Sequence, residues 1–77
     1  MRTNVKLYFH ADGAKPTEVM AKVKSVGFKV SVGRFDVYYD WGKEVAEAEI
    51  MGLADKVKNA LNGTKATFII ETNKYQE

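Results

Sequence analysis

Residues 28–41, FKVSVGRFDVYYDW, carry the pattern that decides the fold. Apolar and polar residues alternate on both sides of Gly33, which is typical of two strands that each bury one face. Glycine accepts a positive φ without steric cost, so Gly33-Arg34 suits the two-residue loop of a β-hairpin. With this loop, Val30 lies opposite Val37 and Lys29 lies opposite Tyr38, and each pair points to one face. The segment therefore predicts an antiparallel hairpin.

Each side of the hairpin carries one more strand and one more helix. Residues 4–10, NVKLYFH, alternate in polarity and predict a strand. Residues 17–26 carry valines at helical spacing after Pro16, which is a favoured first residue of a helix. Residues 43–61 repeat the helical pattern, and Gly52 within them indicates either close packing or a small kink. Residues 66–71, ATFIIE, predict the last strand.

The element order is therefore strand, helix, strand, strand, helix, strand. Right-handed crossovers leave room for an intervening strand between the two strands that each helix connects. We predict a single α+β domain over residues 1–77 of the ferredoxin-like type, βαββαβ, with a polar tail at 72–77. Its antiparallel four-stranded sheet has the order 4-1-3-2, with both helices on one face. The side chains predicted to face the helices are Val5, Leu7, Phe9, Val30, Val32, Phe35, Val37, Tyr39, Phe68 and Ile70.

The composition narrows the classes of function. The chain contains no cysteine, which removes disulfides, thiolate metal ligands and cysteine nucleophiles. Its formal net charge is +2, and the charges are mixed along the chain, so attraction to polyanions is mild. No apolar segment approaches the length of a membrane span, and the N-terminus lacks the apolar core of a signal peptide. We therefore expect a cytoplasmic protein without a membrane partner.

The sheet face away from the helices is the candidate interaction surface. Alternation assigns to this face Lys6, Tyr8, His10, Lys29, Asp36, Tyr38, Asp40 and Ile69. A register that pairs Lys6 with Asp40, Tyr8 with Tyr38 and His10 with Asp36 places two tyrosines and Ile69 at the centre. The simplest interpretation is that this face of the sheet is exposed to solvent and binds no partner. An apolar centre with a polar rim is also typical of protein interfaces. We expect a non-catalytic interaction module that forms a homodimer or binds another protein.

The same tyrosines allow an alternative function in RNA binding. RNA-recognition domains share this topology and stack bases on aromatic residues of the first and third strands. Tyr8 matches the stacking position of the first strand, and Tyr38 supplies an aromatic residue on the third. Residues 33–38, GRFDVY, match the third-strand motif only loosely, and Asp36 and Asp40 would repel phosphate. Nucleic acid is therefore the weaker alternative as a partner.

The central hairpin also resembles part of a known family of regulatory domains. Residues 33–37, GRFDV, lead through a strand into a helix and are similar to the Gly-X-Tyr-Asp hairpin of RAM domains. The rest of the chain shares only the topology of RAM and ACT domains. The resemblance implies a ligand-sensing module that forms dimers or higher oligomers and binds a small molecule between subunits. Acylphosphatases share the fold too, but their arginine-bearing phosphate loop has no counterpart here.

The candidates for chemistry are few. His10 is the single histidine, and together with Asp12 and Asp36 it could ligate a divalent metal or form an acid–base pair. A surface histidine paired with Asp36 is the simpler interpretation. The glycine-rich GxGxxG motif is absent, so the sequence indicates no cofactor and favours a non-enzymatic role. We expect Met20 and Met51 to pack in the core, and Trp41 to close the core under the second helix.

Overall fold

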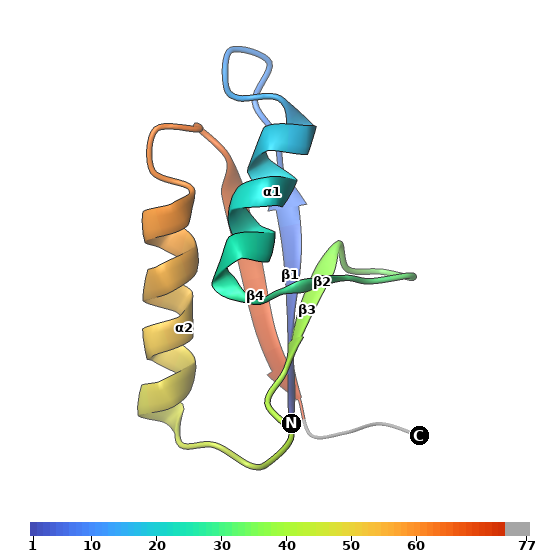
Figure 1. Ribbon diagram of the computed structural model, residues 1–77, viewed down its shortest axis with the longest axis vertical. Helices are drawn as coiled ribbons and strands as arrows, with labels where there is room; N and C mark the ends of the chain where they lie inside the picture. Colours follow the sequence, from blue (N-terminus) through green and yellow to red (C-terminus); the bar gives the residue numbers. More distant parts are fainter. Residues whose placement is uncertain (74–77) are drawn as a thin grey trace.

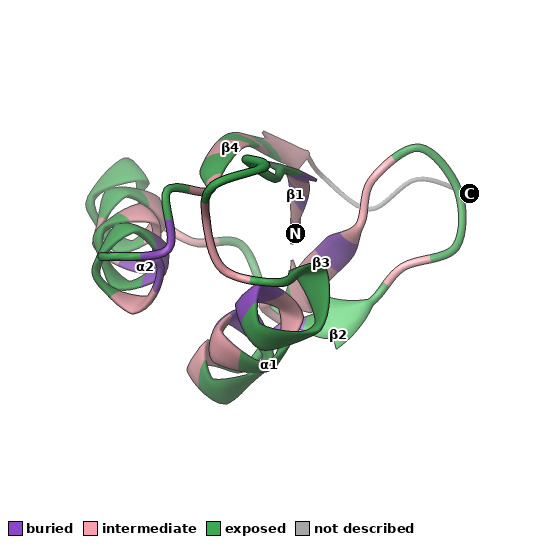
Figure 2. Ribbon diagram, turned by 90° about the horizontal axis from the view of Figure 1, so that it is seen from above, coloured by how far each residue is buried: buried purple, intermediate pink, exposed green. Residues whose placement is uncertain are grey.

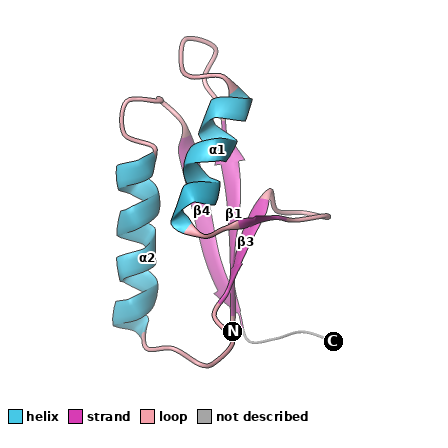
Figure 3. Ribbon diagram, in the orientation of Figure 1, coloured by secondary structure: helices cyan, strands magenta, loops and turns pink. Residues whose placement is uncertain are grey.

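The computed structural model describes residues 1–73, and its element order is the predicted one (Figures 1 and 3). The elements are β1 (Arg2–Tyr8), α1 (Pro16–Val26), β2 (Lys29–Val30), β3 (Val37–Asp40), α2 (Glu47–Ala60) and β4 (Thr67–Asn73). The sheet is antiparallel with the order β2-β3-β1-β4, which is the predicted order read from its other edge. Both helices lie on the same side of the sheet (Figure 2). This α+β arrangement is consistent with the predicted ferredoxin-like fold.

Several element ends differ from the prediction. β1 begins at Arg2 instead of residue 4, and β4 continues to Asn73, so residues 72–73 belong to the sheet and not to a polar tail. The remainder of that predicted tail, 74–77, lies outside the described residues. α2 begins at Glu47 rather than at 43, and the Glu49 side chain accepts a hydrogen bond from the Ala46 N–H. That bond satisfies a backbone donor next to the start of α2.

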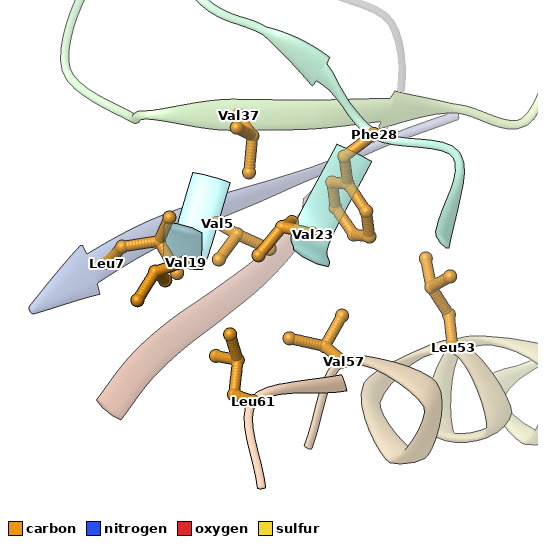
Figure 4. Packing of buried hydrophobic residues seen from close by; sticks show 9 residues of the cluster. All are labelled: Val5, Leu7, Val19, Val23, Phe28, Val37, Leu53, Val57 and Leu61. Atoms are coloured by element: carbon orange, nitrogen blue, oxygen red, sulfur yellow. The ribbon is translucent and has the colours of Figure 1, made fainter. Parts of the chain in front are cut away.

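The core lies between the sheet and the two helices (Figure 4). Val5, Leu7 and Val37 contribute the sheet side, as predicted. The helices and the segments after them contribute the rest of the buried cluster, which consists of Val19, Val23, Phe28, Leu53, Val57 and Leu61. Since each fully buried valine or leucine contributes about 1.5–3 kcal/mol, this cluster is the main source of stability for so short a chain.

The hairpin has the predicted pairing over a shorter length. Lys29 lies opposite Tyr38 and Val30 opposite Val37, as expected, and the Ser31 N–H donates to the Asp36 carbonyl. Beyond these pairs the tip leaves the sheet and projects away from the helices (Figure 1). Val32 is consequently 97% exposed, so the prediction that it faces the core is wrong. Val30 lies opposite the buried Val37 and therefore points to the helix side as predicted, but at the sheet edge it is 52% exposed. Gly33 has the predicted positive φ, 123°.

Of four other predicted core residues, Phe9 and Met51 differ from the prediction, and Met20 and Trp41 agree with it. Phe9 follows the last residue of β1 and is 44% exposed instead of buried. Met51 is 59% exposed on α2, whereas Met20 packs against the core as predicted. Trp41 also packs against the core. A Cβ atom on Gly52 would meet nothing within 4 Å, which excludes close packing as the reason for this glycine.

One buried polar group joins three segments of the chain. Thr3 is completely buried, and its Oγ1 accepts a hydrogen bond of 2.8 Å from the Trp41 Nε1–H. The Thr3 and Thr72 hydroxyl groups share a second hydrogen bond of 2.8 Å. These bonds tie β1 to β4 and to the residue that follows β3. We refer to Thr3, Trp41 and Thr72 as the hydroxyl cluster.

Candidate functional site

The sheet face away from the helices, here called the open face, carries most of the predicted interaction residues. The odd-numbered residues Thr3, Val5 and Leu7 of β1 are buried on the helix side, so the even-numbered ones point to the open face. The same alternation in the paired strands assigns to the open face Arg2, Asn4, Lys6, Tyr8, Lys29, Tyr38, Asp40, Thr67, Ile69 and Glu71. Arg2 was not predicted, because the first strand was expected to begin at residue 4. Asn4 lies within the expected strand but was not among the predicted interaction residues.

The predicted register between the first and third strands is wrong. Tyr38 lies opposite Asn4, not Tyr8, and Asp40 lies opposite Arg2, not Lys6. The register follows the core, because it places Val5 opposite Val37 and both residues are completely buried. Tyr8 therefore lies four residues beyond the partner of Tyr38, which is ~13 Å along the strand at about 3.3 Å per residue. The two tyrosines do not form a pair.

Tyr38 is instead covered by a cation. The Arg2 guanidinium carbon lies 4.4 Å from the centre of the Tyr38 ring, within the range of a cation–π interaction. Lys29 lies opposite Tyr38 on its other side, in β2. Tyr38 is half-buried, and one face of its ring is covered by the Arg2 guanidinium of the same chain.

The apolar part of the open face lies over β1 and β4. Lys6 is paired with Ile69 and Tyr8 with Thr67, which makes Tyr8 and Ile69 diagonal neighbours. Tyr8 is 47% exposed and Ile69 is 55% exposed. These two side chains form the exposed apolar centre that the sequence predicted from three residues, with Tyr38 excluded from it.

His10 and Asp36 have separate local roles. His10 follows β1, and its Nδ1 accepts a hydrogen bond of 3.1 Å from the Asp12 N–H. The Asp36 carboxylate accepts a bond of 2.7 Å from the Leu7 N–H, and the Asp36 N–H donates to the Val5 carbonyl. Asp36 directly precedes β3 and thus continues the hydrogen bonding of β1 beyond the first residue of β3. The predicted pairing of His10 with Asp36 is wrong, and residues 1–73 contain no group of three His, Asp or Glu side chains arranged to hold a metal.

An apolar hollow next to α1 was not predicted from the sequence. Its volume is about 520 Å³, and its lining consists of Phe9, Pro16, Thr17, Met20, Ala21, Lys24 and Asp36. The hairpin tip projects away from the helices (Figure 1), and Phe9, which lines the hollow, remains 44% exposed. A sequence pattern that assigned Phe9 and Met20 to the core could not reveal it.

The comparisons with known proteins leave the family open. No protein-family model, no curated protein sequence and no solved structure matches the chain. The resemblance of residues 33–37 to RAM domains therefore stays a prediction. In addition, none of the helices within residues 1–73 combines the length and apolar character that a membrane span requires.

Proposed function

We propose that this protein is a non-catalytic association module, and that its open face binds a partner protein, in the simplest case a second copy of the chain. The proposal is supported mainly by one observation: both helices cover the same side of the sheet, and the uncovered side presents Tyr8 and Ile69 at about half exposure. Tyrosine side chains with an apolar neighbour are common anchors at protein interfaces.

The charges around this apolar centre favour a protein partner. Arg2, Lys6 and Lys29 contribute positive charge to the open face, and Asp40 and Glu71 contribute negative charge. A surface with both signs can complement a second copy of itself, whereas a nucleic acid needs a predominantly positive surface. The RNA alternative also loses the adjacent aromatic pair on which it depended, because Tyr38 lies beneath Arg2 and apart from Tyr8.

A small-molecule ligand fits the same proposal at a different place. The hollow next to α1, about 520 Å³, lies within the usual size range of small-molecule sites, roughly 300–1,000 Å³. Its lining is mostly apolar and includes two charged residues, Lys24 and Asp36, which could orient a polar ligand. A ligand in this hollow would lie next to α1 and would leave the open face uncovered.

Sedimentation velocity over a range of protein concentrations tests the open face. We expect Tyr8→Ala to weaken self-association at least about tenfold, since an interface anchor typically contributes more than 1 kcal/mol and occurs twice in a two-fold dimer. Met51→Ala is the matched control, because Met51 is 59% exposed but lies on α2, on the helix side of the sheet. Equal association constants for the wild type, Tyr8→Ala and the Met51→Ala control would refute the proposal.

A further inference from the structure

The two edges of the sheet are very different. β2 forms one edge with only two residues, after which the chain leaves the sheet. β4 forms the other edge with seven residues, and it lies at the end of the sheet in Figure 2. Within residues 1–73 no further strand pairs with β4 on its outer side. A long unpaired edge is a template for pairing with another chain.

The hydrogen bonds of β1 show which backbone groups of β4 are free. Met1 accepts from the Trp41 N–H, Val5 accepts from the Asp36 N–H, and the Leu7 N–H donates to Asp36, so odd-numbered residues of β1 bond toward β3. Even-numbered residues of β1 therefore bond toward β4. Their partners are Thr67, Ile69, Glu71 and Asn73. The backbone N–H and C=O groups of the alternate residues, Phe68, Ile70 and Thr72, consequently point outward.

The sequence of β4 lacks the features that usually block edge pairing. Thr67–Asn73, TFIIETN, contains no proline and no lysine, and its central residues are Ile69 and Ile70. The opposite edge, in contrast, carries Lys29 and ends after Val30. Short strands, lysines and prolines are the usual means by which proteins protect an edge. Only the β4 edge is therefore long enough and open enough to pair with another strand.

We infer that β4 pairs antiparallel with β4 of a second copy of the chain, about a two-fold axis at Ile70, and joins the two sheets into one. Ile70 then lies opposite Ile70 of the other copy, and Phe68 lies opposite Thr72. Three outward-facing residues on each strand form three pairs and about six hydrogen bonds. Pairing of β4 with β2 would use only two residues of β2, so the two-fold arrangement satisfies more backbone groups and closes on itself.

The side chains agree with this register on both faces. On the open face, Ile69 lies opposite Glu71 of the other copy and Thr67 lies opposite Asn73, so no like charges meet. On the helix side, Phe68 and Ile70 are only half-buried within the single chain. Pairing places the same residues of the second copy beside them and covers more of their apolar surface. The interface is small, so we expect a dimer that depends strongly on protein concentration.

A proline at an outward-facing position tests the inference. Thr72→Pro removes an N–H that β1 does not use, and edge strands tolerate such a proline. We expect it to raise the dimer dissociation constant more than about tenfold, because the two-fold pair loses two hydrogen bonds. Thr72→Val is the matched control, because it removes the same hydroxyl group, which bonds to Thr3, but keeps the N–H. We expect the control to dimerise like the wild type.

Amide hydrogen exchange measured by NMR gives a second readout that a change in stability would not imitate. In dilute protein we expect slow exchange at Ile69 and Glu71, which bond to β1, and fast exchange at Phe68, Ile70 and Thr72. As the concentration rises, these three amides should gain protection of at least about tenfold. Fast exchange at the three amides in concentrated protein, or a dissociation constant that is equal for Thr72→Pro and Thr72→Val, would overturn the inference.

This inference goes beyond the proposed function and does not rest on it. Edge pairing leaves the open faces of both copies uncovered, so the proposal for the edge and the proposal for the open face can be tested independently. If only the edge acts, Thr72→Pro yields monomers, while Tyr8→Ala, which changes a residue of β1 outside the β4 edge, retains the exchange pattern and the dimer. If only the open face acts, Thr72→Pro retains the dimer and Tyr8→Ala yields monomers. If both act, two edge-paired dimers join through their faces, and each variant reduces a tetramer to a dimer.

Discussion

Replacement of Thr3 by valine should destabilise the protein although it changes the shape of the side chain very little. The Thr3 hydroxyl accepts from the Trp41 indole N–H and shares a hydrogen bond with Thr72, both at 2.8 Å. Valine removes both bonds and leaves a partly buried indole N–H without its partner. Thr3 itself is completely buried, so water cannot take its place without a rearrangement of the cluster.

The expected loss follows from these contacts. A neutral hydrogen bond contributes about 0.5–1.5 kcal/mol net, and a buried donor left unpaired costs about 1–3 kcal/mol. The indole of Trp41 is only half-buried and regains some hydration, and valine adds some apolar burial. We therefore expect a loss of about 2 kcal/mol in the free energy of unfolding. For a domain of this size such a loss lowers Tm by about 8–16 °C.

Urea denaturation measures this loss directly. Trp41 is the only tryptophan, so its fluorescence reports on the cluster itself, and far-ultraviolet circular dichroism reports on the whole fold. Thr72→Val removes only the bond between the hydroxyl groups and should cost about 0.5–1.5 kcal/mol. In a Trp41→Phe background, which has no indole donor, Thr3→Val should cost clearly less than in the wild type. An equal cost in both backgrounds would refute the role assigned to the indole bond.

Two further predictions concern stability. A Cβ atom at Gly52 meets open space within a helix, so Gly52→Ala should raise the unfolding free energy by about 0.5–1 kcal/mol. At Gly13 the added Cβ meets the carbonyl oxygen of Thr64, so Gly13→Ala should lower the unfolding free energy by about 1–3 kcal/mol. Thermal unfolding of the two glycine variants measures both changes, and changes of the same sign would contradict these predictions. Asp36→Ala removes the acceptor for the Leu7 N–H and should cost about 1.5–3 kcal/mol, whereas Asp36→Asn keeps an acceptor oxygen and should cost less. Equal urea midpoints for the two Asp36 variants would show that the carboxamide cannot replace the carboxylate at Leu7.

The sequence by itself determined the local features of this protein. Alternation over residues 28–41 and the position of Gly33 predicted the hairpin and its pairing of Lys29 with Tyr38, because a short loop leaves two adjacent strands one register. Helical periodicity predicted both helices and the valines that α1 buries. Right-handed connections then limited the order of the strands to the one observed. Each of these inferences depends on neighbours in the chain or on a general rule of topology.

Only the tertiary structure decided which residues of β1 and β3 lie side by side. Alternation restricts a register to shifts of two residues, because a shift by two or four keeps every side chain on the same face. The observed register differs by four residues from the predicted one, since Tyr38 lies opposite Asn4 instead of Tyr8. Core packing of Val5 against Val37 and the bonds of Thr3 select it, and all of these join residues far apart in the sequence.

The same reason explains why the sequence did not reveal the hydroxyl cluster, the hollow next to α1 or the open edge of β4. Each of them depends on where one element ends relative to another. β3 begins at Val37, opposite Val5, so Leu7 has no partner within β3 and its N–H donates to Asp36 instead, while Phe9 remains 44% exposed. β4 is an edge because the four strands close no barrel and no further described strand follows. Residue patterns predict the face to which a side chain points, but the packed chain determines its neighbours.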